Sequence, residues 1–481
     1  MITVVGLGPG CYDLLTLRAA RILESAPQVF LRTAQHPTVV SLPESVRWVA
    51  FDDVYKQAPD FEAVYDTIVA RLLELAAKGE AVVYAVPGDP SLGEATVRRL
   101  IERAASERQE VRLIPGVSFL SAALAAGPGS ASGHLQIMDA LAPVELNPLL
   151  PAVVYQLHDR RVASSVKLEL LRLYPPDHRV SVVQGGDASQ TARGLALAEL
   201  DRKMDFDHLT SLYVPPLAPE RAISSPFGLR AIVHRLRAPG GCPWDRAQTP
   251  ASLVRYVLEE AYEVADAIRE GDPHGLREEL GDLLLQVYLQ AEIAEESGDF
   301  DLTNVIRGIS EKLISRHPHV FAGVEVANAE EVERNWERLK QAEKGEAPSA
   351  LDAIPRSMPA LARAQEIQRK LSKANFEFPD RKGVLGKLDE ELAEIREAVG
   401  DAQRLESELG DVLFMLAKLA TDAGLDAEAA LRGTIQRVIS RYRYVERCAA
   451  QRGSSVSALG LDTLIELWEQ AKETERSGNP S

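Results

Sequence analysis

Short apolar runs alternate with longer amphipathic stretches along the first part of the chain. The strand-like runs lie at residues 2–5, 29–31, 81–86, 111–114, 152–157 and 180–183. Between them, residues 17–25, 61–78, 95–105 and 164–173 place their apolar positions at helical spacing. Alternation of this kind is typical of an α/β domain with a largely parallel sheet. The pattern therefore predicts an α/β domain over residues 1–218.

In the second half of the chain the pattern changes to long amphipathic helices. Thr249 precedes Pro250, and such a pair is typical of a helix N-cap followed by proline in the first turn. Gly271 ends that helix, and Asp272 with Pro273 begins the next one. So short a connection favours an antiparallel pair of helices. We therefore expect an all-α region here.

The chain is too long for a single ordinary core, because it has 481 residues. A segment rich in Pro, Ser and Ala divides the helical region into two halves. We expect a multidomain chain with an α/β domain at residues 1–218, a linker at 219–226, a first all-α helical repeat at 227–345, a linker at 346–358 and a second all-α helical repeat at 359–481.

Both helical halves carry the same cluster of acidic residues. The acids are Glu260, Glu263, Glu279 and Asp282 in the first half, and Glu391, Glu394, Glu408 and Asp411 in the second. The two members of each pair are three residues apart, so on a helix they share one face. So much negative charge in one place is unfavourable unless protons or cations neutralise it. Carboxylate oxygens in this number suit Mg²⁺ or Mn²⁺, so all eight acids are candidate metal ligands and catalytic residues.

The duplication extends beyond the acids. Residues 312–316 correspond to 437–441, and residues 336–340 correspond to 468–472. Each half therefore contains acids, a basic pair four residues apart, and a tryptophan followed by a lysine. A divalent ion, basic residues that contact phosphates and an aromatic ring that stacks on a base make a coherent nucleotide site. The candidate nucleotide-binding residues are Arg437, Arg441, Trp468, Lys472, Lys312, Arg316 and Lys340, and Trp336, Phe376 or Phe378 could supply the stacking ring in place of Trp468.

An ordinary structural explanation of these residues has to be weighed against a functional one. Glu and Lys on helices usually form a solvated face with ion pairs, and tryptophans usually belong to the core. However, Glu408 and Asp411 lie beside the apolar residues Leu409, Val412 and Leu413. Acids next to a buried stripe are costly without partners, and packing gives no reason to repeat ionic residues. The repeated pattern therefore favours metal sites.

Further motifs resemble the MazG family of nucleoside triphosphate pyrophosphohydrolases, over residues from about 227 to 475. These motifs are GCPWD at 241–245, LEEAYE at 258–263, ELGD at 279–282, RHPHVF at 316–321 and IPRS at 354–357. The resemblance implies an all-α fold of the type found in all-α dUTPases, usually assembled as a homodimer. It also implies hydrolysis of nucleoside triphosphates to nucleoside monophosphates and pyrophosphate, for nucleotide-pool control or removal of aberrant nucleotides.

The resemblance also implies roles for particular residues. Glu391, Glu394, Glu408 and Asp411 match the metal ligands of the catalytic repeat, and Arg437, Arg441, Trp468 and Lys472 are similar to its nucleotide-contacting positions. We hypothesise that water, deprotonated with help from a carboxylate such as Glu394, attacks the α-phosphorus and that pyrophosphate leaves. The first repeat keeps its four acids, so hydrolysis there stays an open alternative.

Three glycine-containing loops follow strands of the α/β domain. They are GLGPG at 6–10, PGDP at 87–90 and IPGVS at 114–118. These loops would line the carboxyl edge of one sheet, where α/β domains usually bind ligands. Together with TLRAA at 16–20 they resemble the tetrapyrrole methylase family, which uses S-adenosylmethionine, and the resemblance covers residues 1–218. It implies cofactor contacts at Gly6, Gly8, Pro9, Gly10, Pro87, Gly88 and Asp89.

The α/β domain departs from this family at one place. Tyr155 is followed by Gln156 where the family has a Tyr-Met pair, so methylation of a tetrapyrrole should not be assumed. Three hypotheses stay open: a pyrophosphohydrolase with a methyltransferase-like domain, a methyltransferase whose helical region is a nucleotide-sensing regulator, and a non-catalytic nucleotide-sensing protein.

Composition limits the partners and the compartment. A net charge of −17 argues against binding a nucleic-acid polymer, which would need a basic surface. The three cysteines are far apart and indicate a reducing compartment. No apolar run reaches the roughly 18–20 residues of a membrane span, and the chain opens into a strand-like segment without a signal peptide. We expect a cytoplasmic protein that acts on nucleoside triphosphates and binds no membrane.

Overall fold

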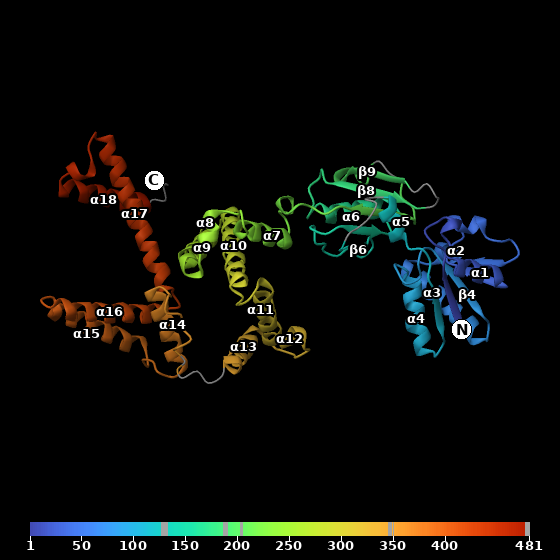
Figure 1. Ribbon diagram of the computed structural model, residues 1–481. Helices are drawn as coiled ribbons and strands as arrows, with labels where there is room; N and C mark the ends of the chain where they lie inside the picture. Colours follow the sequence, from blue (N-terminus) through green and yellow to red (C-terminus); the bar gives the residue numbers. More distant parts are fainter. Residues whose placement is uncertain (127–132, 186–190, 203–204, 345–348, 350, 477–481) are drawn as a thin grey trace. The chain divides into compact units, whose positions relative to one another are not determined.

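The computed structural model describes residues 1–126, 133–185, 191–202, 205–344, 349 and 351–476. Contacts divide the chain into two compact units, Met1–Ile309 and Ser310–Ser481. The α/β region and the helices through α10 belong to the first unit. Helix α11 (Leu302–Arg316) crosses the boundary, and the later helices belong to the second unit (Figure 1).

The first part of the α/β region is a five-stranded parallel sheet with strand order β3-β2-β4-β1-β5. Its strands are β1 (Ile2–Gly6), β2 (Gln28–Leu31), β3 (Arg47–Ala50), β4 (Val82–Val86) and β5 (Val111–Ile114). Its helices are α1 (Leu17–Ser25), α2 (Asp52–Gln57), α3 (Phe61–Ala77) and α4 (Ala95–Ser106). Because β4, β1 and β5 are parallel neighbours, their carboxyl ends meet at one edge, as the sequence predicted.

A second five-stranded sheet completes the α/β region, with strand order β6-β7-β10-β8-β9. Its strands are β6 (Gln136–Asp139), β7 (Ala152–Tyr155), β8 (Arg179–Gln184), β9 (Thr191–Ala196) and β10 (Thr210–Val214), accompanied by α5 (Phe119–Ala126) and α6 (Arg160–Leu170). Strand β6 is parallel to β7, whereas the other described pairs are antiparallel. The expectation of a largely parallel sheet is therefore wrong for this half. The segment between β8 and β9 is too short for the crossover that a parallel pair needs.

The helical region begins with α7 (Pro226–Arg237), α8 (Pro243–Ala247), α9 (Pro250–Glu270) and α10 (Pro273–Ser297). The predicted helix ends are confirmed. The Thr249 side chain accepts a hydrogen bond from the Ser252 amide, and Gly271 adopts a left-handed φ of 67°. Asp272 then caps α10 by accepting from the His274 amide. Helices α9 and α10 pack against each other, around Leu253 and Leu289 in the core.

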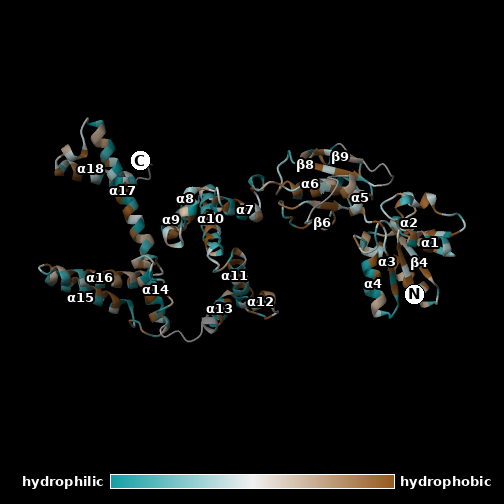
Figure 2. Ribbon diagram, in the orientation of Figure 1, coloured by the Kyte–Doolittle hydropathy of each residue, from teal (hydrophilic) through white to brown (hydrophobic). Residues whose placement is uncertain are grey.

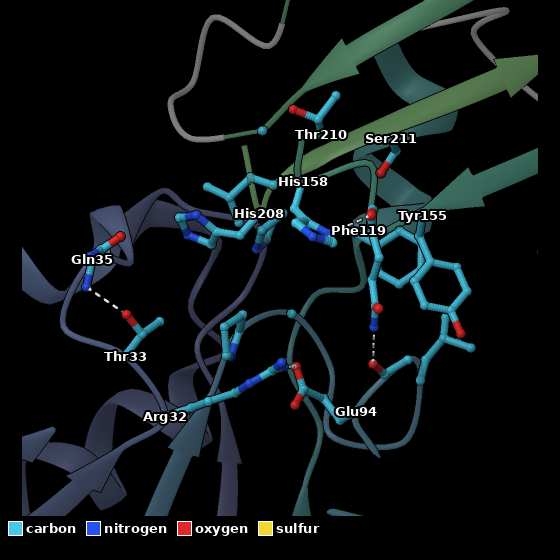
Figure 3. A pocket seen from close by; sticks show the side chains of 18 of the residues that line it. Arg32, Thr33, Gln35, Glu94, Phe119, Tyr155, His158, His208, Thr210 and Ser211 are labelled. Atoms are coloured by element: carbon cyan, nitrogen blue, oxygen red, sulfur yellow. Dashed lines mark hydrogen bonds and ion pairs between the residues drawn. The ribbon is translucent and has the colours of Figure 1, made fainter. Parts of the chain in front are cut away.

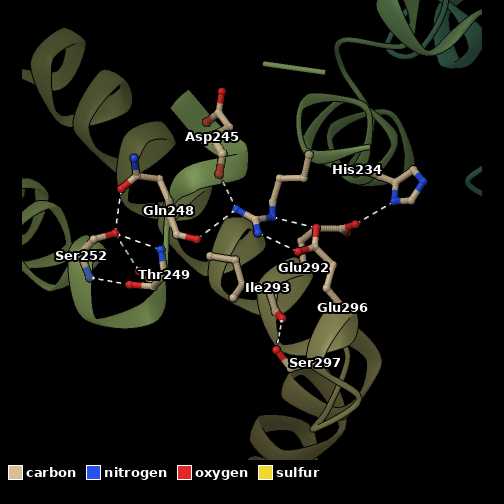
Figure 4. A network of polar contacts seen from close by, with 10 residues as sticks. His234, Asp245, Gln248, Thr249, Ser252, Glu292, Ile293, Glu296 and Ser297 are labelled. Atoms are coloured by element: carbon tan, nitrogen blue, oxygen red, sulfur yellow. Dashed lines mark hydrogen bonds and ion pairs between the residues drawn. The ribbon is translucent and has the colours of Figure 1, made fainter. Parts of the chain in front are cut away.

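Arg237, at the end of α7, connects three of these helices through polar contacts (Figure 4). Its Nε and Nη2 atoms donate to the two carboxylate oxygens of Glu296 on α10, at 2.8 and 2.7 Å. Its Nη1 atom donates to the backbone carbonyl of Asp245 on α8. A nearly buried guanidinium with this many acceptors stabilises the packing of α7 and α8 on α10.

The second unit is helical throughout its described residues. After α12 (Pro318–Phe321) and α13 (Ala329–Lys344) come α14 (Ala360–Lys373), α15 (Arg381–Ala398), α16 (Ala402–Asp422), α17 (Ala427–Gln451) and α18 (Leu461–Arg476). Helix α15 packs on α16, as α9 packs on α10, and α17 packs on α18. The strands of the α/β region are predominantly hydrophobic, whereas the helices carry hydrophilic and hydrophobic faces (Figure 2). Among the described residues, none of the helices has the length and apolar character of a membrane span.

Candidate functional site

The acids of the first helical repeat converge between α9 and α10. Glu260 and Glu263 lie on α9, and Glu279 lies on α10. One carboxylate oxygen from each of these three residues lies within 4.8 Å of the others. Asp282, the fourth predicted acid, is close enough to raise the pKa of Glu260. We call these four residues the first acid cluster.

The acids of the second repeat converge in the same way between α15 and α16. Carboxylate oxygens of Glu391, Glu408 and Asp411 all lie within 4.8 Å of one another. Glu394 is close enough to Glu408 to add to the increase in its pKa that burial causes. These four residues form the second acid cluster, in which Glu391 is buried and Asp411 is exposed. The structure thus brings three of the four predicted acids together in each repeat, with the fourth close enough to affect a neighbouring pKa.

The pKa values of carboxylates in both clusters are raised, by burial and by the neighbouring acids. The pKa of Glu408 is raised by burial, and then by its contacts with Glu394 and Asp411. The pKa of Glu279 is raised by burial and by Glu263, and that of Glu260 by burial and by Asp282. A divalent cation would relieve this repulsion, and a set of four carboxylates offers the hard oxygen ligands that Mg²⁺ and Mn²⁺ prefer. The residues present therefore fit such an ion.

Two basic side chains contact the second acid cluster, and sequence reasoning missed both. Lys387 Nζ lies 2.9 Å from a carboxylate oxygen of Glu391 and 2.9 Å from one of Glu390. These contacts raise the pKa of Lys387, so its charge is held at the cluster. Arg404 Nε lies 4.0 Å from Glu408. The signal was present in the sequence, because each cation precedes its acid by four residues, a neighbouring position on a helix.

The predicted nucleotide-binding residues of the second repeat lie on α17 and α18. Arg441 donates from Nε to Glu475 at 2.8 Å, and its guanidinium lies 5.9 Å from the centre of the Trp468 ring. Lys472 donates to Glu469 at 2.7 Å, and Arg437 donates to the Thr434 hydroxyl at 2.8 Å. The structure therefore brings Arg441 and Trp468 together, as expected for two parts of one binding surface.

The corresponding residues of the first repeat show a similar pairing. The Arg316 guanidinium lies 5.6 Å from the centre of the Trp336 ring, and the His317 ring meets Trp336 edge-on at 5.1 Å. Lys312 is exposed on α11. The side chain of Lys340 lies outside the part of the chain that the structure describes.

The glycine loops of the α/β domain meet at the carboxyl edge of the parallel sheet. The amide of Gly88 donates to the carbonyl of Gly8 at 2.8 Å, and the amide of Gly8 donates back to Gly88 at 3.1 Å. A Cβ atom at Gly6 would lie only 2.5 Å from the Gly88 carbonyl oxygen and 2.7 Å from the Gly116 nitrogen. Asp89 accepts a hydrogen bond from the Gly116 amide at 3.0 Å. The loops are thus packed so closely that only glycine fits at Gly6.

A cavity of about 390 Å³ opens between these loops and the second sheet (Figure 3). Pro9, Pro87 and Gly88 line it from the loops, and Thr210 and Ser211 line it from β10. Gly6, Gly8, Gly10 and Asp89, the other predicted cofactor residues, belong to the same loops. A concave site that combines backbone amides with a few polar side chains is what a small-molecule ligand requires.

The cavity also contains Arg32 and Glu94, which the sequence did not indicate, and Gln156, which it did. Arg32 at the end of β2 and Glu94 before α4 form an ion pair of 2.5 Å. Gln156, the residue that replaces methionine in the family pattern, has a φ of 65° and donates from its side chain to the Gly93 carbonyl. A positive φ is costly for a residue with a side chain, so the protein holds Gln156 at the cavity against an intrinsic preference.

Comparisons with known proteins match both regions. The sequence model of the MazG nucleotide pyrophosphohydrolase domain matches residues 248–321 and 381–446, and that of the tetrapyrrole (corrin/porphyrin) methylases matches residues 1–193. The uncharacterized protein YabN of Bacillus subtilis is 40% identical over 484 residues, covering 99% of both chains. The nucleoside triphosphate pyrophosphohydrolase of Escherichia coli is 45% identical over 254 residues, covering 51% of this chain and 97% of that protein.

A solved structure is similar to the α/β region. Uroporphyrin-III C-methyltransferase from Thermus thermophilus, complexed with S-adenyl homocysteine, is 21% identical with a TM-score of 0.35, covering 44% of this chain and 96% of that one. The two matches of the MazG model contain the first and second acid clusters, one in each. The chain therefore belongs to the MazG family of nucleotide pyrophosphohydrolases and carries a tetrapyrrole methylase domain before its two MazG repeats.

Proposed function

We propose that the chain hydrolyses nucleoside triphosphates to nucleoside monophosphates and pyrophosphate, with Mg²⁺ or Mn²⁺ held by the second acid cluster. The observation that carries this proposal is the convergence of Glu391, Glu408 and Asp411 within 4.8 Å. The family membership of the chain and its similarity to the nucleoside triphosphate pyrophosphohydrolase of Escherichia coli support the proposal. Glu391, Glu394, Glu408 and Asp411 would hold the ion.

When bound, the divalent ion would neutralise the carboxylates and the triphosphate and lower the pKa of a nearby water. Glu394 would accept a proton from the water that attacks the α-phosphorus. The new bond joins the water oxygen to phosphorus, the bond to the bridging oxygen breaks, and pyrophosphate leaves with its electron pair. Lys387, Arg437 and Arg441 would contact the phosphates as negative charge develops. Trp468 and Lys472 would contact the rest of the nucleotide.

We assign the main activity to the second repeat because it has cations beside its acids. Once a metal ion occupies the carboxylates, Lys387 no longer has to neutralise Glu391 and can pair with a phosphate oxygen. The first acid cluster is a second candidate centre; Lys312, Arg316 and Lys340, the basic residues predicted for its repeat, belong to the second compact unit. Separate inactivation of the two clusters tests this assignment.

We infer that the α/β domain binds S-adenosylmethionine through the loops that contain Gly6, Gly8, Pro9 and Gly10, and Pro87, Gly88 and Asp89. Support comes from the methylase family match and from the cavity that these loops border. This cavity also favours a second candidate function, in which the domain transfers methyl groups and the helical region is a nucleotide-sensing regulator.

We propose that the chain acts as a homodimer in the cytoplasm. Leu409, Leu413 and Leu416 on α16 are each exposed by more than 40% within a single chain, and a second copy would bury such an apolar face. All three cysteines are free, as suits a reducing compartment. The proposed partners are nucleoside triphosphates, with no nucleic-acid polymer and no membrane among them.

The test of the pyrophosphohydrolase is to incubate the full chain with the common nucleoside triphosphates and Mg²⁺ and to separate the products. We expect nucleoside monophosphate and pyrophosphate in equal amounts, and loss of both when a chelator removes the metal. Nucleoside diphosphate with inorganic phosphate, or no product from any nucleotide, would refute the proposal. Light scattering measures the assembly, for which a monomer mass would be the contrary result.

A further inference from the structure

We propose that the acceptor end of the cavity in the α/β domain takes a small, uncharged ring compound and excludes polycarboxylates such as tetrapyrroles. The proposal rests on the inference that the glycine loops bind S-adenosylmethionine, because that donor would occupy one end of the same cavity. It depends on three observations: the aromatic walls, the internal pairing of the charges, and the volume.

Aromatic side chains from both halves of the α/β region line the cavity, and Figure 3 labels Phe119, Tyr155 and His158 among them. The ring centre of Phe119, at the start of α5, lies 5.0 Å from that of Tyr155 at the end of β7. The Phe61 ring on α3 meets the His158 ring edge-on, with the ring centres 5.9 Å apart. It also stacks on the Tyr65 ring, with the centres 6.2 Å apart. Flat, apolar surfaces that face a cavity favour a planar ligand, which can stack on them or meet their edges.

Three charged residues of the lining already have polar partners within the protein. Arg32 is paired with Glu94 at 2.5 Å, and its Nε atom also donates to the Tyr55 hydroxyl at 2.9 Å. Asp52 accepts hydrogen bonds from the Thr33 hydroxyl at 2.6 Å and from the Ala34 amide at 2.8 Å. These groups have their partners before any ligand enters, so they have little left to offer to a charged one.

Other titratable groups of the lining are Lys56, His208, Tyr155 and His158, whose Nε2 atom lies 3.6 Å from an Asp159 carboxylate oxygen. Lys56 is largely exposed and lies 3.5 Å from the carboxylate of Asp53. Burial lowers the pKa of His208, which keeps that imidazole neutral at neutral pH. Burial, with Asp139 as a neighbour, raises the pKa of Tyr155 to about 12, so its hydroxyl also stays neutral. Among the described lining residues, the arginine is Arg32 and the lysine is Lys56. Arg32 is paired with Glu94, and Lys56 with Asp53.

A carboxylate entering this cavity would lose its hydration and, in the described lining, find no lysine or arginine without an acidic partner. Burying an ionised group without a partner costs several kcal/mol, so each added carboxylate weakens binding steeply. The cavity of about 390 Å³ also lies near the lower end of small-molecule sites, which are roughly 300–1,000 Å³, and it must hold the donor as well. A macrocycle with several acidic arms therefore fits neither the charge nor the space.

In a transfer, a lone pair of the ring compound's nucleophilic atom would bond to the methyl carbon as the carbon–sulfur bond breaks. The sulfonium would become a neutral thioether, and the acceptor would lose its proton to water. A neutral acceptor suits this reaction, because the products at this end of the cavity are neutral as well.

The test compares 2-naphthol with 2-naphthoate, which share one ring system and differ by the carboxylate. Binding of each to the full chain is measured by calorimetry at neutral pH, with S-adenosylhomocysteine at saturation, and uroporphyrin serves as the polycarboxylate probe. We expect 2-naphthol to bind at least about 10-fold more tightly than 2-naphthoate, and uroporphyrin not to bind. Equal or tighter binding of 2-naphthoate or uroporphyrin would overturn the proposal.

The Glu94→Gln variant tests the charge argument directly. It keeps the shape of the side chain and frees the Arg32 guanidinium, so the preference for 2-naphthol should shrink or reverse. Glu74→Gln removes an exposed carboxylate of α3 and is the matched control, which should keep the wild-type preference. If Glu94→Gln does not fold, Phe119→Leu replaces it and should weaken 2-naphthol binding several-fold; an unchanged affinity would count against the aromatic wall.

The same experiment separates this proposal from the donor assignment. If S-adenosylhomocysteine binds and none of the ring compounds does, the acceptor proposal is overturned and the donor site stands. If S-adenosylhomocysteine does not bind, the donor assignment falls. The ring preference is then measured on the chain without it, and a lack of preference there would overturn the acceptor proposal as well.

Discussion

The two acid clusters have the same four acids but different neighbours. Glu391 has Lys387 four residues before it, whereas Glu260 has Tyr256 at that position. Lys387 contacts the carboxylate, but Tyr256 packs edge-on against Trp244 at a ring distance of 5.9 Å. The same substitution pattern occurs on the second helix of each pair, where Arg404 precedes Glu408 and Gly275 precedes Glu279.

The neighbouring cations matter for binding and hydrolysing a triphosphate, but not for holding a metal ion. Four carboxylates are enough to hold a divalent ion, and both clusters have them. A triphosphate also needs cations that meet its oxygens as charge moves to the leaving group. Lys387 and Arg404 supply positive charge beside the second cluster, whereas Tyr256 and Gly275 cannot. This difference is the reason why we propose hydrolysis at the second repeat.

We expect the largest effect on kcat when one carboxylate charge is removed from each cluster in turn. Glu408→Gln should lower kcat for pyrophosphate release by about 100-fold or more, because it removes a ligand while keeping the side-chain shape. Glu279→Gln, the same change at the matching position, should lower kcat less than about 3-fold. Pyrophosphate release with saturating nucleotide measures both.

A larger loss of kcat in Glu279→Gln than in Glu408→Gln would assign the activity to the first cluster and contradict the role given to Lys387. Equal losses would mean that both centres turn over. A Glu408→Gln variant with unchanged kcat would remove the proposed site altogether. Thermal unfolding of each variant shows whether a loss of activity comes from the site or from the fold.

A smaller effect is expected from Lys387→Met, which keeps the length of the side chain and removes its charge. A charge-assisted hydrogen bond to a phosphate contributes about 1.5–3 kcal/mol, so KM for the nucleotide should rise by at least about 10-fold. Lys382→Met removes an exposed cation from the same helix and should leave KM unchanged. If the two variants behave alike, Lys387 only neutralises Glu391 and the comparison of the clusters loses its basis.

Sequence reasoning found the acids because a helix converts spacing directly into position. A separation of three residues places Glu260 and Glu263 on one face, whatever the rest of the chain does. Lys387 and Arg404 carried the same kind of signal at four residues, but basic residues before acids on a helix are also the common pattern of a solvated surface. Their proximity to the cluster could be judged only with the second helix in place.

The cavity of the α/β domain could not be predicted in this way. Arg32 and Glu94 lie 62 residues apart and meet because β2 and β4 are neighbours in the sheet. The antiparallel second sheet was missed for a related reason. Strand β8 shows the same short apolar run as the parallel strands, whereas β9, with the sequence TARGLA, shows none, so the hydrophobic pattern did not reveal this antiparallel pair.

The two tryptophans offer a test with a more modest effect. Trp468→Leu should raise KM about 3- to 10-fold, because an aromatic contact contributes roughly 0.5–1.5 kcal/mol beyond its buried area. Trp336→Leu removes the equivalent ring of the first repeat, where it lies against Arg316, and should leave KM within about 2-fold of the wild type. A larger effect at Trp336 would place the nucleotide at the first repeat, and the assignment of the second repeat would have to be abandoned.

The smallest effect concerns the stability of the metal-free chain. The pKa of Glu408 is raised in the folded state by burial and neighbouring acids, so the folded chain holds the proton more tightly than the unfolded chain. The resulting stabilisation is fully present below the unfolded pKa and is lost as the pH rises through the folded pKa. When a chelator keeps the chain free of metal, raising the pH from 5 to 8 should therefore lower the Tm of the wild type relative to that of Glu408→Gln, by about a degree or two.

Thermal unfolding across this pH range measures the difference in Tm, and added Mg²⁺ should remove that difference in the wild type by occupying the carboxylates. If the difference has the opposite sign, or persists with Mg²⁺ present, the acids repel one another too weakly to need an ion. The two clusters would then be equivalent surface charge, and the cations beside the second would have no triphosphate to meet.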